Sequence, residues 1–538
     1  MNAASVALPV LPRPRVVSAS AGEFPLERLR ISRGGQWDHL LDHFASEVLL
    51  DTGRTIESGV DGIRLERGVV VRDDLPFTEG VRADGAHDTD ESYQLTISSR
   101  GVRILAPCEE GAFRGLTTLR QLIAAARGAK LPAVDIRDAP LYHWRGLSLD
   151  VSRTFHGPET LRRVIDMASL YKLNVLHLHL TDDQGWRLEV PEWPLLTSVG
   201  GQGAVDDRPG GWYSAAEVSE LVAYAAERFV TLVPEIDVPG HVQAIFHAYP
   251  ELDPHSDRGS KAAALGFAIG TLDLDHGDTG RLLEDVFRAA ADQFTTSSYL
   301  HLGGDEAFGM SESAHAAFVE RTAEIVRGLG KLPVGWQETA RGRLQAGHLV
   351  QYWMEPREAA RLTESDALGQ LPPEVAAVLA ENMLAAASDV PRACAQGAGV
   401  IMSPFTRLYF DRPHGDAAQD PAQEEPRSRL GLPFYSPSTL RDGVDWDPRK
   451  ELPGTEADRG AIAGIEAALW CETVRDRDDL EFLLLPRLPG AAERAWASAG
   501  HEWDAYRLSL ASQSHVWRAR EWNWFRAAGI DWDKESNQ

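Results

Sequence analysis

The apolar positions of the first 138 residues follow first a strand pattern and then a helix pattern. Residues Glu91 to Ser99 alternate between apolar and polar positions, Arg100-Gly101 makes a turn, and Val102 to Ala106 returns with strand character. The next segment, Glu109 to Ala125, carries its apolar residues at helical spacing. We therefore predict a small α+β domain over residues 1–138.

Beyond that domain, short apolar runs alternate with amphipathic helices. Helix boundaries are marked by Pro158, by a capping box of Ser214 and Glu217, and by Gly330. Eight apolar runs precede or follow these helices: Gly146–Asp150, Asn174–Leu180, Phe229–Asp237, Tyr299–Gly304, Pro333–Trp336, Leu349–Trp353, Gly399–Ser403 and Gly464–Trp470. Eight strands that alternate with helices predict a (β/α)8 TIM barrel of the α/β class over residues 139–538. A doubly wound open sheet is the alternative.

Three segments lie outside a minimal barrel. Residues 355–398 form a long insertion after the sixth predicted strand, and residues 412–455 form a long loop after the seventh. Loops of this length commonly carry binding, lid or assembly contacts. The tail from residue 501 has helical composition and is rich in tryptophan. We expect it to pack against the barrel as a C-terminal helical tail.

Polar side chains gather where the predicted strands end. They are Asp150 and Arg153, Asp182 and Asp183, Glu235, Asp237 and His241, Asp305 and Glu306, Trp336, Trp353, Tyr409 and Asp411, and Trp470 and Glu472. The C-terminal ends of barrel strands meet at one face, which carries the active site in such enzymes. Aromatic rings stack on the apolar faces of pyranose sugars, and carboxylates with arginine bind sugar hydroxyls. The pattern therefore indicates a sugar-binding site.

Asp305 and Glu306 supply adjacent carboxylates for acid catalysis. A glycosidase needs a carboxylic acid whose pKa is raised by burial or by a neighbouring negative charge. In the common retaining scheme the acid and the nucleophile lie about 5–5.5 Å apart across the scissile bond. Consecutive residues that leave a strand point in different directions, so this pair is awkward in that arrangement. The pair suits a mechanism in which the substrate supplies its own nucleophile.

The motifs in these segments resemble glycoside hydrolase family 20, the β-N-acetylhexosaminidases, and especially its bacterial members. The resemblance covers almost the whole chain. It rests on Leu11–Pro14, Phe113–Leu116, Trp144–Gly146, Asp150–Arg153, His177–Arg187, Pro234–His241, His301–Glu306, Trp470–Glu472 and Pro486–Gly490. The family's usual tryptophan in the loop after the seventh strand is absent, and Leu432-Pro433-Phe434-Tyr435 stands there.

The resemblance implies an exo-acting, retaining enzyme that removes terminal non-reducing β-linked N-acetylglucosamine or N-acetylgalactosamine. In that mechanism the 2-acetamido oxygen attacks the anomeric carbon and forms an oxazolinium intermediate. Glu306 is then the general acid and base, Asp305 holds the acetamido N–H, and Tyr409 donates to the acetamido oxygen. The implied supporting residues are Trp336, Trp353 and Trp470 around the acetamido methyl group, Arg153, Asp411 and Glu472 at the sugar hydroxyls, and an Asp182–His241 dyad that tunes Glu306.

Composition narrows the partners of the chain. It has 538 residues and a formal net charge of −26, which repels phosphate backbones and anionic lipids. We therefore expect an oligosaccharide or glycoconjugate substrate, no nucleic acid and no membrane partner, and neither cofactor nor metal.

Three scattered cysteines, Cys108, Cys394 and Cys471, imply no disulfide framework. The N-terminus lacks the pattern of a secretory signal, which favours a cytoplasmic enzyme. The sequence leaves the aglycone, the choice between the two sugars and the oligomeric state open.

Two alternatives accompany this interpretation. His177-Leu178-His179 resembles the start of a metal-dependent amidohydrolase barrel, with His241, His301 and Asp305 as further candidate ligands. A non-catalytic sugar-binding relative is the second alternative. Such proteins commonly lose the acid, whereas Glu306, Asp305 and Tyr409 are all present here.

Overall fold

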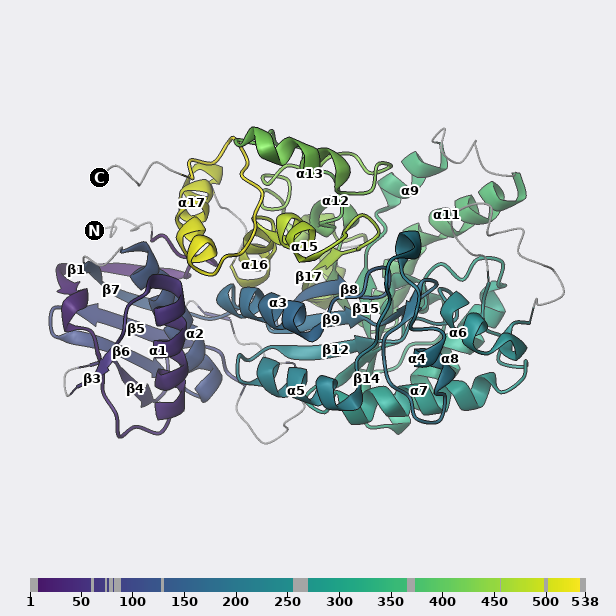
Figure 1. The fold of residues 1–538 in the computed structure, drawn as a ribbon, viewed down its shortest axis with the longest axis horizontal. Coiled ribbons are helices and arrows are strands. Elements are labelled where there is room, and N and C mark those ends of the chain that lie inside the picture. The colour runs from purple at the N-terminus through teal and green to yellow at the C-terminus, as the bar shows by residue number, and fades with distance from the viewer. Residues whose placement is uncertain are drawn as a thin grey trace.

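The fold is taken from a computed structural model of the chain. The structure describes residues 8–59, 62–72, 75–76, 81, 89–126, 130–254, 270–364, 373–454, 456–497 and 502–532. A small sheet domain at one end of the molecule adjoins a larger barrel domain (Figure 1). Both parts confirm the predicted architecture, a TIM barrel preceded by a small α+β domain.

The N-terminal domain is a five-stranded sheet covered by two helices. The strand order is β1-β7-β5-β6-β4. The strands are β1 (Val16–Pro25), β4 (Arg64–Arg67), β5 (Tyr93–Ser98), β6 (Gly101–Ala106) and β7 (Lys130–Asp138). Helix α2 (Glu109–Ala125) packs on β5 and β6, and α1 (Asp38–Thr52) packs on α2. Nearly every residue of α2 is buried, because the sheet, α1 and the C-terminal helix α17 (Trp503–Ala519) surround it.

A buried ion cluster joins the two domains. Glu91 Oε2 lies 2.8 Å from Arg114 Nε of α2 and 2.5 Å from Arg145 Nη2 at the start of the barrel. All three side chains are fully buried. Two of the motifs that carry the family resemblance, around Arg114 and Arg145, therefore hold the domains together and lie apart from the catalytic face. Removing one member of such a cluster leaves an uncompensated buried charge.

The second domain is a closed barrel of eight parallel strands in the order β12-β13-β14-β15-β16-β17-β8-β9. The strands are β8 (Trp144–Asp150), β9 (Val175–His179), β12 (Thr231–Glu235), β13 (Tyr299–His301), β14 (Leu332–Trp336), β15 (Leu349–Tyr352), β16 (Gly399–Met402) and β17 (Ile462–Leu469). Each overlaps a predicted run. Strand β13 ends early because Gly303 and Gly304 adopt positive φ angles.

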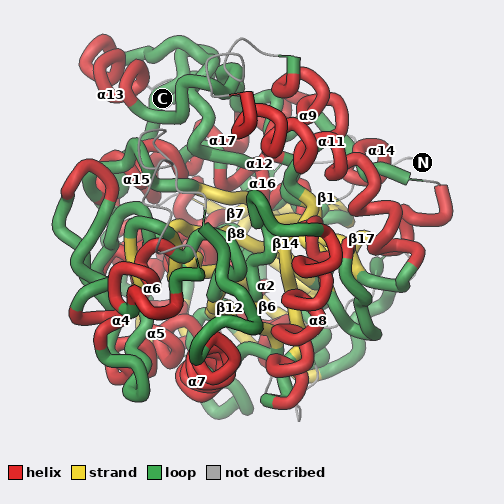
Figure 2. The backbone as a smooth tube through the Cα atoms, turned by 90° about the vertical axis from the view of Figure 1, so that its right-hand side faces the viewer, coloured by secondary structure: helices red, strands yellow, loops and turns green. Residues whose placement is uncertain are grey.

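Helices surround the barrel, as Figure 2 shows from the end opposite the N-terminal sheet. They include α3 (Pro158–Leu170), α5 (Ala215–Ala226), α7 (Thr279–Gln293), α8 (Glu312–Gly328), α15 (Arg477–Leu484) and α16 (Leu488–Trp496). The capping box predicted at Ser214 and Glu217 is present at the start of α5. Small helices that follow strand ends, α4 (Leu195–Ser198), α6 (Gln243–Ala248) and α9 (Pro356–Thr363), lie on the side away from the N-terminal domain (Figure 1).

The segment 355–398 differs from the expected insertion. It contains α9 and the long helix α11 (Pro373–Ala395), which packs on β15, on β16 and on the turn η6 (Gln337–Arg341). Between β14 and β15, where every residue is described, η6 is the only helical element, so this barrel unit has no long helix of its own. Helix α11 therefore covers the wall of this unit as well as that of the unit after β15. The segment therefore belongs to the barrel wall.

The remaining additions lie near the barrel mouth and along its side. The segment 412–455 has only short helical elements in its described part: η7 (Pro421–Gln423), α13 (Glu424–Arg429) and α14 (Pro448–Glu451). The tryptophan-rich tail forms α17, and Trp517 packs in the main core as predicted. Within the described residues, the structure contains no helix with the length and apolar character needed to cross a bilayer.

Candidate active site

A pocket of about 160 Å³ opens at the C-terminal end of the barrel. Seven of the eight strands, all except β14, lead into residues that line it. The lining residues are Arg153, His179, Asp182, Asp237, His241, Asp305, Glu306, Trp353, Tyr409, Leu432, Phe434, Tyr435, Trp470 and Glu472. Nine of the eleven predicted site residues are therefore brought together in one pocket. The other two, Trp336 and Asp411, lie behind its wall, as described below.

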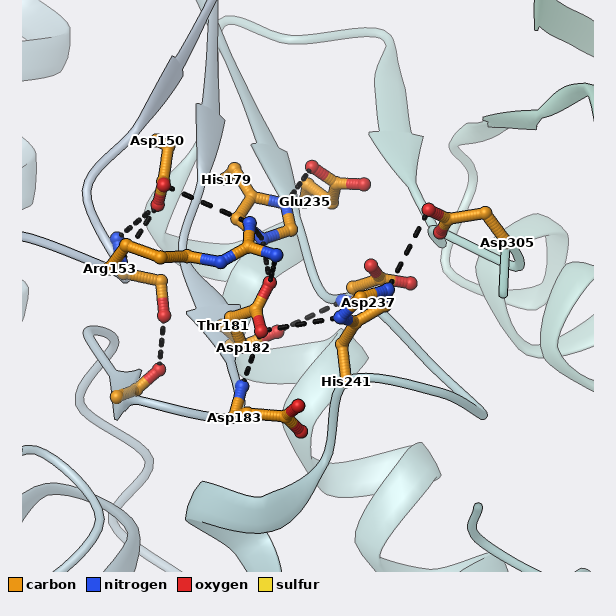
Figure 3. Close-up of polar contacts among 12 residues, drawn as sticks. Asp150, Arg153, His179, Thr181, Asp182, Asp183, Glu235, Asp237, His241 and Asp305 are labelled. Atoms are coloured by element: carbon orange, nitrogen blue, oxygen red, sulfur yellow. Dashed lines mark hydrogen bonds and ion pairs between the residues drawn. The ribbon is translucent and has the colours of Figure 1, made fainter. Parts of the chain in front are cut away.

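Glu306 stands at the end of a chain of polar contacts. His241 Nε2 lies 3.5 Å from Glu306 Oε2, and His241 Nδ1 lies 3.3 Å from Asp182 Oδ1. Burial alone disfavours the imidazolium, but the charge of Asp182 and the contact with Glu306 raise the pKa of His241 well above its ordinary value. Figure 3 shows His241 between Asp182 and the Asp305 side of the site. The predicted dyad is therefore placed to act on Glu306.

Asp305 approaches the same imidazole from the neighbouring position. Its Oδ2 lies 3.8 Å from His241 Nε2, so both carboxylates reach one nitrogen instead of diverging. Glu306 itself has a φ of 45°, in the left-handed region that residues other than glycine rarely adopt. Burial, followed by the charge of Asp237, raises the pKa of Asp305 well above its usual range. Its Oδ1 is buried and has no hydrogen-bond partner among the described residues.

Glycine is required just before this pair. A Cβ on Gly303 would lie 1.7 Å from Asp237 Oδ1, and its φ of +67° disfavours other residues. The close approach lets Asp237 accept a hydrogen bond from the Gly304 N–H at 3.1 Å. The Gly-Gly sequence therefore sets the direction in which the chain leaves the barrel at Asp305.

Aromatic rings form the wall opposite the carboxylates. Trp353 and Tyr409 are stacked, with ring centroids 6.4 Å apart and planes 8° from parallel. Tyr409 is 6.0 Å from Trp470 in an edge arrangement, and Trp336 lies 5.9 Å from Trp470. Trp336 is 1% exposed and supports Trp470 from beneath the pocket surface. Burial raises the pKa of Tyr409 well above its ordinary value, so its hydroxyl stays protonated and able to donate.

Charged side chains occupy the remaining side of the pocket. The guanidinium of Arg153 lies 5.0 Å from the Trp470 ring centre, and its Nη2 is 2.7 Å from Asp182 Oδ2. Asp411 is 1% exposed, and neither of its carboxylate oxygens bonds to another described residue. Glu472 Oε2 is likewise buried and unpartnered within that part of the chain. Burial and the charge of Glu472 raise the pKa of Asp411, and burial raises that of Glu472.

A layer of buried residues supports the pocket from inside the barrel. Asp150, His179, Glu235 and His301 are successive register partners on four adjacent strands, which explains why distant residues meet at one level. His179 lies 2.6 Å from Glu235 Oε2 and 2.8 Å from Asp182 Oδ2 (Figure 3). His179 has no predicted role in sugar binding. The two-residue spacing between His177 and His179 indicates that both side chains face the same side of the strand, because alternate strand residues do so.

Tyr435 and Phe434 are further pocket residues without a predicted role. Tyr435 stands 6.4 Å from Tyr409 edge to face, and Phe434, 54% exposed, lies 4.4 Å from Tyr435 at the pocket rim. Both come from the segment that replaces the family's usual tryptophan. Only the three-dimensional course of the loop 412–455 shows that this segment reaches the pocket.

The histidines considered as metal ligands lie close to carboxylates. Among the described residues, four groups have ligand atoms close enough to hold an ion: His177–Glu235–His301, His179–Glu235–Asp237, Asp182–Asp183–His241 and Asp237–His241–Asp305. Most of the histidine nitrogens in these groups already face carboxylates. His177, for example, lies 2.9 Å from Glu466 through Nδ1 and 3.2 Å from Glu235 through Nε2. These contacts account for the histidines as members of the buried network.

Comparison with known proteins gives one consistent family. The family description "Glycosyl hydrolase family 20, catalytic domain" matches residues 142–499, and "Glycosyl hydrolase family 20, domain 2" matches residues 7–139. A β-N-acetylhexosaminidase of Cellulomonas fimi is 37% identical over 446 residues, covering 82% of each chain. A β-hexosaminidase of Akkermansia muciniphila is 31% identical, covering 78% of this chain and 82% of its own.

Solved structures agree over nearly the full length. The family 20 β-N-acetylhexosaminidase of Streptomyces coelicolor A3(2) superposes with a TM-score of 0.81 at 33% identity, covering 98% of this chain and 99% of that one. A mutant β-hexosaminidase of Streptomyces plicatus, in complex with its product GlcNAc, gives 0.80 at 31% identity and 98% coverage of each chain.

The barrel, the carboxylate pair after its fourth strand and the aromatic wall define a glycoside hydrolase. The chain belongs to glycosyl hydrolase family 20 and is a β-hexosaminidase of that family. This assignment overturns both the amidohydrolase alternative and the non-catalytic one.

Proposed function

We propose that the protein is an exo-acting, retaining β-N-acetylhexosaminidase that works by substrate-assisted catalysis. The terminal N-acetylglucosamine or N-acetylgalactosamine of an oligosaccharide or glycoconjugate enters the pocket. Its 2-acetamido oxygen attacks the anomeric carbon, and the bond to the leaving oxygen breaks as Glu306 gives that oxygen a proton. Water, deprotonated by Glu306, then opens the oxazolinium intermediate and restores the β configuration.

The observation that carries this proposal is the place of Asp305. Asp305 lines the same pocket as Glu306, and its buried Oδ1 has no hydrogen-bond partner among the described residues. An acetamido N–H supplies the missing donor, and the carboxylate then offsets the positive charge that develops on the ring nitrogen. The buried carboxylate therefore has a partner when substrate is bound, and that partner belongs to the group that acts as nucleophile.

The aromatic wall and the charged side complete the substrate contacts in this scheme. Trp353, Trp470 and the underlying Trp336 enclose the acetamido methyl group, and the Tyr409 hydroxyl donates to the acetamido oxygen. Arg153, Asp411 and Glu472 bind the outer hydroxyls of the sugar. Proton transfer by a placed acid contributes about 10²–10⁴-fold. Intramolecular attack adds an effective molarity that reaches about 10⁵ M or more.

The test compares aryl β-glycosides that differ only at C2 and C4. We expect the N-acetylglucosaminide, the N-acetylgalactosaminide or both to be hydrolysed and the glucoside to remain intact, because it lacks the internal nucleophile. The first-formed product, followed by NMR before mutarotation, should be the β-anomer. Efficient cleavage of the glucoside, an α-anomer as first product, or a sugar ester on a protein side chain detected by mass spectrometry would each refute the mechanism.

A further inference from the structure

Trp353 of the proposed acetamido wall is held by one short segment, Gln337-Glu338 of η6. Gln337 Oε1 accepts hydrogen bonds from the Trp353 N–H at 3.0 Å and from the Met354 N–H at 2.9 Å. Glu338 Oε2 accepts one from Trp353 Nε1 at 3.2 Å. Gln337 is fully buried and Glu338 is 2% exposed, so neither side chain is free to reorient in solvent.

We propose that Gln337 and Glu338 are positioning residues that place Trp353 in the pocket wall. Gln337 fixes its backbone, and Glu338 fixes the edge of its indole ring. This inference rests on the proposed function, in which Trp353 contacts the acetamido methyl group. Neither residue touches the substrate in that scheme, and both act through the tryptophan.

The segment is itself held from two sides. Gln337 Nε2 donates to the Ala386 carbonyl of α11 at 3.2 Å, which ties the turn to the helix outside the barrel. Trp336, the preceding residue, donates through its indole to Glu235 Oε1 at 2.8 Å in the barrel interior. The Trp-Gln-Glu sequence after β14 therefore links the interior network, the pocket wall and α11. A displaced indole at Trp353 also displaces its stacking partner Tyr409.

Glu338 is suited to this task in its neutral form. Burial raises its pKa well above the usual range, Asp305 and Asp389 add to that effect, and Arg341 opposes it. Arg341 Nη2 lies 2.9 Å from Asp389 Oδ2, so its charge is already shared with another carboxylate. A neutral carboxyl accepts the indole N–H through its carbonyl oxygen and adds no negative charge beside Asp305.

A second cavity gives this buried carboxyl contact with the outside. About 520 Å³ of space lies between the loop after Glu306, η6 and α11, and both Glu306 and Glu338 line it. Glu306 lines both this cavity and the sugar pocket and therefore forms part of the wall between them. Glu381, exposed on α11, lines the same cavity and provides a matched control.

The first experiment measures selectivity for the N-acyl group. Aryl glucosaminides carrying N-acetyl or N-propionyl are compared for Glu338→Gln, Glu338→Leu and Glu381→Gln. Gln keeps a neutral acceptor of the same shape, so Glu338→Gln should retain kcat/KM within about threefold and keep the pH profile. Glu338→Leu leaves the indole N–H without its acceptor. We expect kcat/KM for the N-acetyl substrate to fall about tenfold or more, and the N-propionyl to N-acetyl ratio to rise. Glu381→Gln should match the wild type in every assay.

The second experiment reads the indole directly and does not depend on catalysis. In protein labelled with ¹⁵N-tryptophan, the Trp353 indole resonance is the one that disappears in Trp353→Phe. It should keep its position in Glu338→Gln and move in Glu338→Leu, while the resonances of the tryptophans outside the pocket wall stay unchanged. Glu338→Met, which is unbranched, replaces the leucine variant if that protein does not fold.

The two readouts separate this inference from the proposed function. An unmoved Trp353 resonance in Glu338→Leu or Glu338→Met overturns the positioning role, whatever the enzyme hydrolyses. An unchanged acyl ratio in these variants also overturns it. A pH profile altered in Glu338→Gln overturns the neutral form, because removing a charge beside Asp305 would then matter. If the resonance moves while the glucoside is cleaved as fast as the N-acetyl substrate, the positioning role stands and the proposed mechanism fails.

Discussion

Two pairs of buried carboxylates on the same barrel differ in what surrounds them. In the interior, Glu235 contacts three histidines and an indole N–H, and Glu466 contacts a histidine, a glutamine and an indole. At the pocket, one oxygen of Asp305, which lines it, and both oxygens of Asp411, which lies behind its wall, have no partner among the described residues. Burial opposes the ionisation of Glu235, yet its histidines hold its pKa well below the usual range, whereas burial raises the pKa values of Asp305 and Asp411.

The difference separates two uses of a buried charge. An unpartnered buried carboxylate costs free energy, and a folded protein retains it where a ligand supplies the missing donors. The interior pair has its donors within the protein and contributes to the fold. In the proposed function, a bound sugar supplies the N–H and O–H groups that the pocket pair lacks. The comparison therefore predicts that substitutions in the pocket change activity and spare stability, whereas substitutions in the interior do the reverse.

The largest effect is expected at Glu306, the proposed general acid. Glu306→Gln removes the proton donor but keeps the shape of the side chain, so kcat should fall about 10²–10⁴-fold while Tm stays unchanged. The loss should be greatest for substrates with poor leaving groups, such as a disaccharide, and smaller for activated aryl glycosides that need little protonation. Hydrolysis rates across a leaving-group series, together with calorimetry, measure both quantities. An equal loss across the series would mean that Glu306 is not the acid.

The reverse behaviour is expected at Glu235. Glu235→Ala leaves His177, His179, His301 and the Trp336 indole without their shared acceptor in the barrel interior. Removing one partner of a buried ion network typically costs about 3–5 kcal/mol. The free energy of unfolding in denaturant should fall by that amount, and kcat/KM should fall much less than in Glu306→Gln, because Glu235 supports the pocket without lining it. Glu235→Gln, which keeps one acceptor oxygen, should lose less. An alanine variant as stable as the wild type would show that the interior carboxylates do not stabilise the fold in the way that distinguishes them from the pocket pair.

The sequence predicts the barrel well because its strands follow one repeated pattern. Strand positions, the capping box at Ser214 and helix α2 all follow from local periodicity and turn chemistry. The segment 355–398 is harder to predict, because α11 covers a wall left open by the short turn η6. That fact depends on which neighbouring unit lacks a helix, and the amphipathic pattern of α11 alone cannot show it.

The prediction of site residues from the sequence has the same limit. Carboxylates and tryptophans at strand ends are visible in the sequence, since the barrel brings every strand end to one face. That reasoning does not identify Glu338, because Glu338 follows Trp336 by two residues and is proposed to act through a hydrogen bond to Trp353. Tyr435 lies in a loop whose path is set by tertiary contacts. Residues that act through another residue therefore require the structure.

A smaller effect, of opposite sign, is expected for stability at Asp411. Its folded pKa is raised by burial and by Glu472, so its deprotonation in the folded state destabilises the protein. The wild type therefore loses stability as pH rises from the ordinary aspartate pKa through the raised folded value. Asp411→Asn escapes this loss. It should be more stable by about 0.5–2 kcal/mol above the raised pKa, and the gain should vanish at low pH.

The same variant should bind substrate poorly, because a neutral amide replaces a carboxylate at the sugar hydroxyls. Thermal unfolding at several pH values and kcat/KM measured in parallel provide the check. A variant that is destabilised at neutral pH would show that Asp411 has a structural partner and belongs with the interior pair.

The smallest effect is expected at Glu312, which lines the outer cavity and forms a 2.7 Å ion pair with Arg392 across α8 and α11. Its side chain is 64% exposed and that of Arg392 is 44% exposed, so solvent and salt screen the pair. Glu312 also begins α8, where a negative charge favours the helix N-terminus. Glu312→Gln should therefore lower stability by less than about 1 kcal/mol at low salt and by less at high salt, with kcat/KM unchanged. Denaturant unfolding at the two salt concentrations tests the stability, and the aryl N-acetylglucosaminide tests the activity. A clear fall in kcat/KM would mean that this outer carboxylate acts on Glu306 through the shared cavity. Glu312 would then belong with the pocket residues and not with their surroundings.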